Sequence, residues 1–311
     1  MNITFFGSSH FSIPVLEALL ASEHSVVQVI STPDKKQGRG QKVGSSVVKA
    51  FAENHRLPVL SPEKLPPAEV VEHVKTGKPD FMVIASYGKL IPPSIFSIAK
   101  IAPLNVHPSL LPKYRGASPI QQAILDGNEK TGVSIAEIIK ELDAGDIFAQ
   151  EETEIDENEN GYQLEERLAH IGAKLVLQVI TQFEAGPIRR IPQDSSTSSY
   201  AKKITSEAGL ILWNRSAQEI YNQVRAYVPW PSAFTFFRGK RLKVLKTQKI
   251  KESSRENPGS IQIDQAKRFL VQTGTSLIEL IQVQLEGRKE MSAYDFAVGQ
   301  RIEKGERFES S

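Results

Sequence analysis

Residues 81–85 are FMVIA, an unbroken apolar run typical of a strand that is covered on both faces of a parallel sheet. The surrounding sequence alternates short apolar runs with stretches of helical spacing. Further strands are expected at 3–6, 26–30 and 133–139, and helices at 14–20, 46–56, 68–76, 117–126 and 162–184. The alternation predicts an α/β fold with a doubly wound, mostly parallel, Rossmann-like sheet. Ligands bind such sheets at the carboxyl ends of the strands.

A change of composition divides the chain after residue 186. Pro187, Pro192 and the serine-rich run 194–199 predict a linker. Ser216 is a suitable N-cap for a following helix. Short strand-like runs separated by turns come next, at 233–237, 241–246, 260–263, 269–273 and 277–284. We therefore expect a first domain at 1–186, a linker at 187–207 and a small β-barrel domain at 208–311.

The bulk composition is that of an ordinary globular protein. The 311 residues suffice for two domains, with 24% charged and 40% hydrophobic residues. Cysteine is absent from the sequence, which excludes disulfides, thiolate nucleophiles and sulfur-based zinc sites. The chain begins with a strand-like run instead of a signal sequence, and its apolar stretches are too short to span a bilayer. We therefore expect a cytoplasmic protein without membrane contact.

Charge is unevenly distributed along the chain. From Ala208 onward, 17 Lys and Arg face 11 Asp and Glu, a net charge of +6, whereas the preceding residues carry 21 against 25, a net charge of −4. A basic second domain indicates a polyanionic partner, although such a surplus is also typical of a solvated surface.

Candidate catalytic residues occur in the segment that follows residue 103. Asn105 and His107 are two residues apart on an extended stretch, so both side chains point to one face. An amide donor beside an imidazole suits acyl transfer, although a lone histidine near a turn is more often structural. Pro108 and Pro112 hold a tight, non-helical connection that can present backbone groups to a ligand. Downstream, Asp143 suits either an Asx-turn or a carboxylate that orients the imidazole and relays a proton.

These residues belong to longer motifs that resemble one family. The segment NVHPSLLPKYRGASPIQQAILDG at 105–127, with TGVSI at 131–135 and LDAGD at 142–146, is similar to the core of the 10-formyltetrahydrofolate-dependent formyltransferases. The likeness covers essentially the full length, through YAKKI at 200–204, VRAYVPWPSAFTFFRGKRLKV at 224–244 and MSAYDF at 291–296. Within the family, the chain resembles the enzymes that formylate initiator methionyl-tRNA.

The resemblance implies a division of labour at the site. Asn105 and His107 would hold the formyl oxygen while the α-amino group attacks. Asp143 would move protons among the amine, the intermediate and the leaving N10 of the folate. 10-Formyltetrahydrofolate would be the co-substrate, and no metal is implied. The folate contacts would come from Ser109, Leu110, Leu111 and Pro112, and from Tyr87 and Gly88.

Two basic regions would contact the tRNA. One is a loop with two glycines, Gly38 and Gly40, that contains Lys35, Lys36, Arg39 and Lys42. The other is the second domain, which in this family is an OB-like barrel. Its candidate contacts are Arg238, Lys240, Arg241, Lys243 and Lys246. Without the resemblance, both regions are more typical of a solvated surface. We expect the protein to be a monomer.

Other functions fit the same scaffold. The formyl group could pass to an amino-sugar nucleotide, or to water as in a formyltetrahydrofolate hydrolase, and an RNA-binding protein could use an inactive scaffold. The basic loop and second domain favour tRNA, and the intact trio of Asn105, His107 and Asp143 favours an enzyme. Four positions carry residues that are unusual for the family, and they bear on the packing of the pocket and on folate affinity. They are Ala136, Ile138, Ile139 and Glu141.

Overall fold

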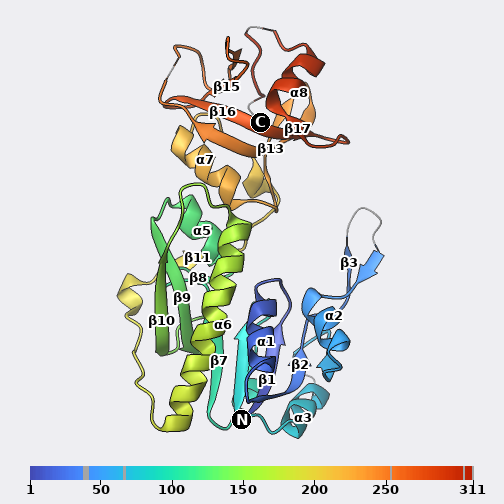
Figure 1. Cartoon of the computed structure of the whole chain (residues 1–311), viewed down its shortest axis with the longest axis vertical. Helices are drawn as coiled ribbons and strands as arrows, with labels where there is room; N and C mark the ends of the chain where they lie inside the picture. Colours follow the sequence, from blue (N-terminus) through green and yellow to red (C-terminus); the bar gives the residue numbers. More distant parts are fainter. Residues whose placement is uncertain (38–41, 66–67, 253, 304, 310–311) are drawn as a thin grey trace. The chain divides into compact units, whose positions relative to one another are not determined.

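The structure is a computed structural model that describes residues 1–37, 42–65, 68–252, 254–303 and 305–309 (Figure 1). The chain forms two compact units. Unit 1 comprises Met1–Pro119, Lys130–Glu154 and Glu165–Lys202. Unit 2 comprises Ile120–Glu129, Ile155–Leu164 and Lys203–Ser311.

Unit 1 is built on a seven-stranded sheet with the order β10-β9-β7-β6-β1-β2-β5. Its strands are β1 (Asn2–Gly7), β2 (Ser25–Ile30), β5 (Val59–Leu60), β6 (Phe81–Ala85), β7 (Ala102–His107), β9 (Lys130–Glu137) and β10 (Ile147–Glu154). The five strands from β5 to β7 pair in parallel, and β9 is antiparallel to both of its neighbours. The predicted mostly parallel α/β sheet is confirmed.

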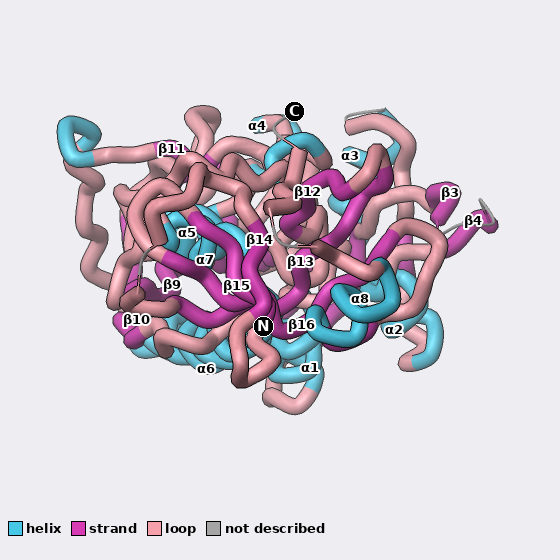
Figure 2. Tube along the Cα trace, turned by 90° about the horizontal axis from the view of Figure 1, so that it is seen from above, coloured by secondary structure: helices cyan, strands magenta, loops and turns pink. Residues whose placement is uncertain are grey.

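Helices cover both faces of this sheet. The helices of unit 1 are α1 (Ser12–Leu20), α2 (Val47–Asn54), α3 (Ala68–Thr76), α4 (Pro93–Phe96) and most of α6 (Gly161–Ala185), whereas α5 (Pro119–Leu125) falls in unit 2 except for its first residue. Figure 2 shows α1 and α6 on one face, and α3 and α4 on the other. Side chains alternate along each strand, so Phe6 and Ile84 pack in one cluster with Val70 of α3. Phe81 instead meets Phe183 of α6, with ring centroids 5.4 Å apart.

The strand that precedes Asp143 is the antiparallel β9. It was expected at 133–139 and ends at Glu137. Its register places Asn105 opposite Ala136. Because β9 runs against β7, the following loop at 138–146 does not leave from the carboxyl edge of the parallel strands. It starts beside β7, where the N–H of Ile138 donates to the carbonyl oxygen of Pro103 at 3.0 Å, and it reaches Asn105 from there.

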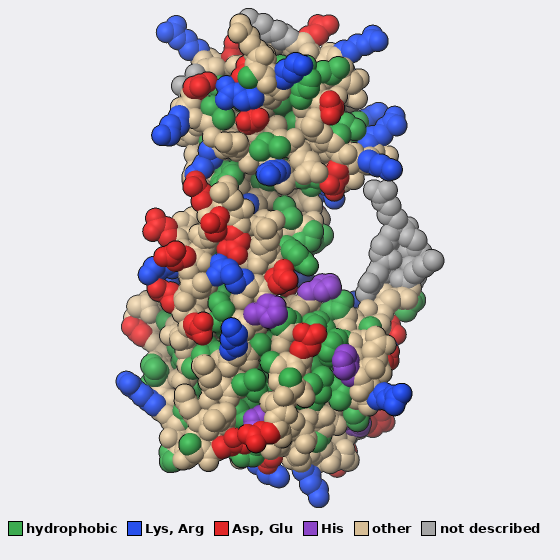
Figure 3. Space-filling view, in the orientation of Figure 1, with side chains coloured by type: hydrophobic (Ala, Val, Ile, Leu, Met, Phe, Trp, Pro, Cys, Tyr) green, Lys and Arg blue, Asp and Glu red, His purple; other side chains and the backbone are tan. Residues whose placement is uncertain are grey.

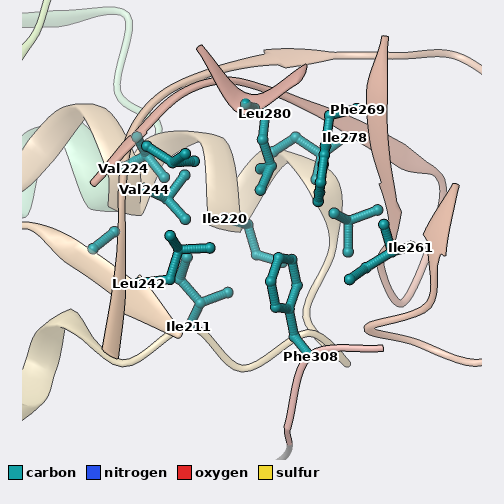
Figure 4. Close-up of a cluster of buried hydrophobic side chains, with 14 of the residues drawn as sticks. Ile211, Ile220, Val224, Leu242, Val244, Ile261, Phe269, Ile278, Leu280 and Phe308 are labelled. Carbon is teal, nitrogen blue, oxygen red and sulfur yellow. The ribbon is translucent and has the colours of Figure 1, made fainter. Parts of the chain in front are cut away.

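Unit 2 contains an antiparallel sheet with the order β12-β13-β16-β15-β14, and β17 pairs with β16. Its elements are α7 (Ala217–Ala226), β12 (Ala233–Phe237), β13 (Lys240–Lys249), β14 (Ile261–Ile263), β15 (Phe269–Gln272), β16 (Leu277–Leu285), β17 (Met291–Ser292) and α8 (Ala293–Gln300). Ser216 caps α7 as predicted, in a reciprocal capping box with Glu219. Figure 4 shows Ile220 of α7 and Leu242 of β13 in the buried cluster that also includes Phe308.

Several short elements complete the fold. A hairpin pairs β3 (Lys35–Gln37) with β4 (Lys42–Gly44), and β8 (Arg115–Gly116) pairs in parallel with β11 (Tyr200–Ala201). Two 3-10 turns are present, η1 (Ser195–Thr197) and η2 (Glu207–Gly209). Residues 187–202, which the composition assigned to a linker, lie within unit 1, and Ile191 pairs there with Ile147 of β10. Backbone pairing of this kind needs no apolar periodicity, so the sequence pattern did not indicate it.

Candidate active site

Asn105 and His107 lie on β7, where the neighbouring strand β6 ends. Asn105 is opposite Ile84, one residue before the last residue of β6. Both side chains approach the same carboxylate, that of Asp143, so they share one face as their spacing predicted. His107 is buried, and Asn105 is partly exposed. The amide and the imidazole therefore lie side by side near the carboxyl ends of the parallel strands.

The Asp143 carboxylate is held by two donors. The Asn105 side chain donates from Nδ2 to Oδ1 at 3.0 Å, and the backbone N–H of Gly116 donates to Oδ2 at 2.8 Å. The same Oδ2 is 3.8 Å from Nδ1 of His107. Only 11% of the Asp143 side chain is exposed. An amide and a backbone N–H thus fix the carboxylate beside the imidazole.

The hydrogen bond of His107 indicates which ring nitrogen is available for proton exchange. Nε2 lies 2.9 Å from the carbonyl oxygen of Tyr114. A carbonyl oxygen only accepts, so Nε2 carries a proton, and in the neutral ring the lone pair is on Nδ1. Nδ1 is the nitrogen that faces Asp143. The imidazole can therefore take up or release a proton beside the carboxylate.

Two backbone conformations near the site are unusual. Asp143 has φ 51°, a left-handed value that non-glycine residues adopt infrequently. Gly116 has φ 109°, and a Cβ there would be 2.7 Å from the carbonyl oxygen of Ala201. Glycine is therefore needed at position 116, where the N–H points to Asp143.

Two residues that sequence reasoning missed hold the loop of Asp143 in place. Gln193 donates from Nε2 to the carbonyl oxygens of Asp143 at 2.9 Å and Gly145 at 2.7 Å. Its Oε1 accepts from Nε of Arg115 at 3.0 Å and from Nη2 at 2.8 Å. Arg115 is only 3% exposed. The signal that could have revealed Arg115 is its position inside the motif at 105–127, whereas Gln193 lies in the predicted linker.

The segment expected to contact folate packs closely against β9 and β10. The N–H of Leu111 donates to Oγ of Ser134 at 3.0 Å, and the carbonyl oxygen of Leu111 accepts from Nε2 of Gln150 at 2.9 Å. Ser109 donates from Oγ to the carbonyl oxygen of Lys113 at 2.7 Å. The side chains of Ser109 and Leu111 are buried. The partly exposed members of the predicted set are Leu110 and Pro112.

The structure separates the roles of Tyr87 and Gly88. Tyr87 is buried, its ring packs edge-on against Phe6 at 5.4 Å, and its hydroxyl has no hydrogen-bond partner among the described residues. Burial raises the pKa of Tyr87 to about 12. The phenol is therefore part of the core. Gly88 has φ 78°, and a Cβ there would meet nothing within 4 Å. Of the two, Gly88 is the residue that borders open space.

The residues expected to contact tRNA differ in their surroundings. Lys35 begins the β3–β4 hairpin and is exposed. Arg39, and the side chains of Lys36 and Lys42, lie outside the described part of the chain. Figure 3 shows Lys and Arg side chains on the surface of unit 2, with acidic side chains among them. Lys240 and Lys246 are exposed there.

Two of the predicted cationic contacts are engaged within unit 2. Nη2 of Arg238 lies 2.8 Å from Oε1 of Glu306. The guanidinium of Arg241 lies 3.6 Å from the ring centroid of Phe234. A phosphate would therefore compete with an existing carboxylate at Arg238, whereas Lys240 is exposed on the surface.

The described residues contain no group of three or more His, Cys, Asp or Glu that is arranged to hold a metal ion. Among the described helices, none combines the length and apolar character needed to cross a bilayer.

The geometry of the site indicates a class of protein. An amide donor, an imidazole and a carboxylate beside an α/β sheet are the groups of an acyl-transfer enzyme. The sequence pattern of the Formyl transferase family matches residues 1–180, and that of the Formyl transferase C-terminal domain matches residues 203–301. A methionyl-tRNA formyltransferase from a Sulfurihydrogenibium species is 43% identical over 311 residues, which are 99% of this chain and 100% of that protein. The chain belongs to the methionyl-tRNA formyltransferase family.

Solved structures share the fold at lower identity. The methionyl-tRNA formyltransferase from Clostridium thermocellum superposes with a TM-score of 0.55 at 18% identity, covering 80% of this chain and 94% of that one. HypX from Aquifex aeolicus in complex with tetrahydrofolic acid superposes with a TM-score of 0.63 at 16% identity, covering 99% of this chain and 50% of that one. These likenesses support the architecture.

Proposed function

We propose that this chain transfers the formyl group of 10-formyltetrahydrofolate to the α-amino group of initiator methionyl-tRNA. The observation that carries the proposal is the contact of the Asp143 carboxylate with Asn105 and His107. The full-length relatives, which are named methionyl-tRNA formyltransferases, support this acceptor. Because the product serves translation initiation, we place the reaction in the cytoplasm, with a monomer as the active form.

The reaction requires a fixed set of bond changes. The amine nitrogen attacks the formyl carbon, and the carbonyl oxygen becomes an oxyanion. The amine then loses a proton, the bond from the formyl carbon to N10 breaks, and N10 gains a proton. The products are the N-formyl amide and tetrahydrofolate. The balance needs a donor for the oxyanion and a group that transfers a proton between two nitrogens, but no covalent nucleophile.

Three side chains divide these tasks in the proposal. One N–H of the Asn105 amide binds Asp143, and the other is assigned to the oxyanion. His107, when protonated on Nδ1, donates to the same oxyanion. The Asp143 carboxylate accepts the proton from the attacking amine and delivers it to N10. Hydrogen bonds from Asn105 and Gly116 keep the carboxylate in position during both transfers.

The chain's own residues suit a flat, largely apolar co-substrate beside this trio. Leu90 is 75% exposed and Ile139 is 37% exposed. Their chain neighbours Ile91 and Ile138 pack against one buried cluster, and we assign the two exposed side chains to one apolar wall beside it. A Cβ at Gly88, two residues before Leu90, would meet nothing within 4 Å. Apolar walls with a few fixed polar groups are typical of cofactor pockets. We assign the folate ring system to this wall.

The acceptor is assigned from charge. The residues from Ala208 onward carry a net charge of +6, and Lys240 is exposed on them. Exposed cations bind the phosphate backbone and release counterions, which makes affinity depend on salt. Lys35, at the base of the β3–β4 hairpin, adds a second exposed cation in unit 1.

A transfer assay tests the proposed function. The chain receives 10-formyltetrahydrofolate with charged initiator tRNA, with an amino-sugar nucleotide, or with no acceptor, in parallel reactions. We expect N-formylmethionyl-tRNA and tetrahydrofolate to form together only in the first reaction. Formylation of the sugar alone, or release of formate at the same rate without an acceptor, would contradict the proposal and favour the corresponding alternative.

A further inference from the structure

Residues 190–193 run along the loop that carries Asp143 and contact the strand residues that adjoin it at both ends. Nη1 of Arg190 lies 2.6 Å from Oε2 of Glu137, the last residue of β9. Ile191 exchanges two backbone hydrogen bonds of 2.9 Å with Ile147, the first residue of β10. The segment is therefore fixed to both strands between which the loop is suspended.

The amide group of Gln193 joins the second half of the same loop to Arg115. Its Nε2 donates to the carbonyl oxygens of Asp143 and Gly145, and its Oε1 accepts from Arg115. A guanidinium has only donors, so Arg115 requires Oε1 on its side and turns the NH2 group towards the two carbonyl oxygens. The buried Arg115 thus sets the orientation of the amide.

We propose that Gln193 is a positioning residue for formyl transfer and acts through Asp143. Asp143 adopts a left-handed φ of 51°, a conformation that persists only where surrounding contacts impose it. The bond from Gln193 to the Asp143 carbonyl oxygen supplies such a contact. It holds the backbone so that the carboxylate meets Asn105 and Gly116. The role rests on the proposed function, because it is defined by the reaction that Asp143 serves.

Two substitutions of Gln193 distinguish the hydrogen bonds of its amide group from the volume of its side chain. Gln193→Met keeps the length of the side chain and removes its hydrogen bonds. Gln193→Glu retains an acceptor for Arg115 and, as a carboxylate, removes the donors to the loop. We expect kcat for initiator tRNA formylation to fall by about 10- to 100-fold in both variants, since a displacement of about 1 Å has this effect on a reacting group. KM for both substrates should change by less than about 3-fold, because Gln193 is assigned no substrate contact.

Gln223 offers a matched control in unit 2. Its Nε2 donates to the carbonyl oxygens of Ala208 at 2.9 Å and Leu210 at 3.0 Å, again two residues apart. It is 5% exposed and lies outside the trio. Gln223→Met should lower the melting temperature about as much as Gln193→Met does. Its kcat should stay within about 2-fold of that of the parent chain. A general loss of stability would lower kcat in both variants and so would overturn the positioning role.

A double-mutant cycle identifies the residue through which Gln193 acts. In an Asp143→Asn background, measured as residual transfer at high enzyme concentration, Gln193→Met should reduce the rate by less than about 2-fold. An equal reduction in both backgrounds, or an unchanged kcat in the single variant, would overturn the inference. If the parent chain formylates tRNA, the proposed function holds whatever the Gln193 variants show. If the parent chain is inactive, the proposed function itself is contradicted.

Discussion

The two regions assigned to the reaction and to the tRNA are organised differently. Around Asp143 in unit 1, donors from separate segments converge on one residue, from β7, from Gly116 and from Gln193. The side chain they hold is largely buried. In unit 2 the candidate cations are on the surface near the β12–β13 turn. There, Lys240 is exposed and Arg238 is paired with Glu306.

The difference follows from what each region must do. Proton transfer requires the donor and acceptor within hydrogen-bond distance, so small displacements have large effects. Attraction of a phosphate backbone depends on charge at a range of several ångströms and tolerates mobile side chains. Substitutions around Asp143 should therefore change kcat strongly, whereas single substitutions in unit 2 should change affinity slightly. The following changes test that contrast.

The largest effect is expected from Asp143→Ala. Loss of the carboxylate removes the group assigned to proton transfer, which typically contributes about 10²- to 10⁴-fold to a rate. We expect kcat for formylation to fall by about 10³-fold, measured in single turnover. Asp264→Ala is a matched control, because the Asp264 carboxylate also accepts two hydrogen bonds, from the backbone and side chain of Arg268. A similar loss of rate in the control would show that any broken carboxylate contact disturbs the reaction.

Gly116→Ala should have the next largest effect. The new Cβ would lie 2.7 Å from the carbonyl oxygen of Ala201, so the backbone must move and carry its N–H away from Asp143. We expect kcat to fall by about 10- to 100-fold. Gly287→Ala provides the control, since Gly287 has φ 74° and open space around it. It should show the strain of a left-handed residue, about 1–2 kcal/mol in urea unfolding, with unchanged kcat. Equal kcat values for the two variants would contradict the role of the Gly116 N–H.

Much of the fold was predictable because it depends on local patterns. The apolar run 81–85 and the alternation around it predicted the parallel sheet, and the Ser216 cap predicted the start of α7. The two-residue spacing of Asn105 and His107 predicted that they face the same way, which their shared contact with Asp143 confirms. The strand pattern and the two-residue spacing follow from the period of the backbone, and the cap follows from the ability of a serine side chain to accept a backbone hydrogen bond.

The remaining features depend on contacts between distant residues. The apolar pattern of β9 is the same for a parallel or an antiparallel strand, so its direction was not predictable. The bond from Gln193 to the Asp143 backbone joins positions 50 residues apart and uses no periodic side chains. Tyr87 is amphipathic, and only the packing against Phe6 shows that its ring belongs to the core.

Lys240→Ala sharpens the contrast from the side of unit 2. An exposed lysine that neutralises one phosphate contributes about one unit to the slope of log affinity against log salt concentration. We expect that slope to decrease by about one unit for initiator tRNA, with kcat unchanged at saturating tRNA. Lys75→Ala is the control, because Lys75 on α3 lies 2.7 Å from Glu72 and outside both proposed tRNA regions. A slope that is identical in the two variants would remove Lys240 from the tRNA contacts.

Arg238→Ala should have the smallest effect, and its effect on stability should depend on pH. The pKa of Glu306 is held below its ordinary value of 4.5, first by the backbone N–H of Glu303 and then by Arg238. A lowered folded-state pKa stabilises the protein above pH 4.5, and this contribution is lost as the pH falls through the folded-state value. Both side chains are partly exposed, so we expect Arg238→Ala to lower the free energy of unfolding by about 0.2–1 kcal/mol at pH 7. In urea unfolding near pH 3 the difference from the parent chain should shrink, because protonation of Glu306 removes the ion pair from the parent chain and the variant has no ion pair to lose. An equal difference at both pH values would show that Arg238 stabilises unit 2 through its packing over Phe237 and not through the ion pair.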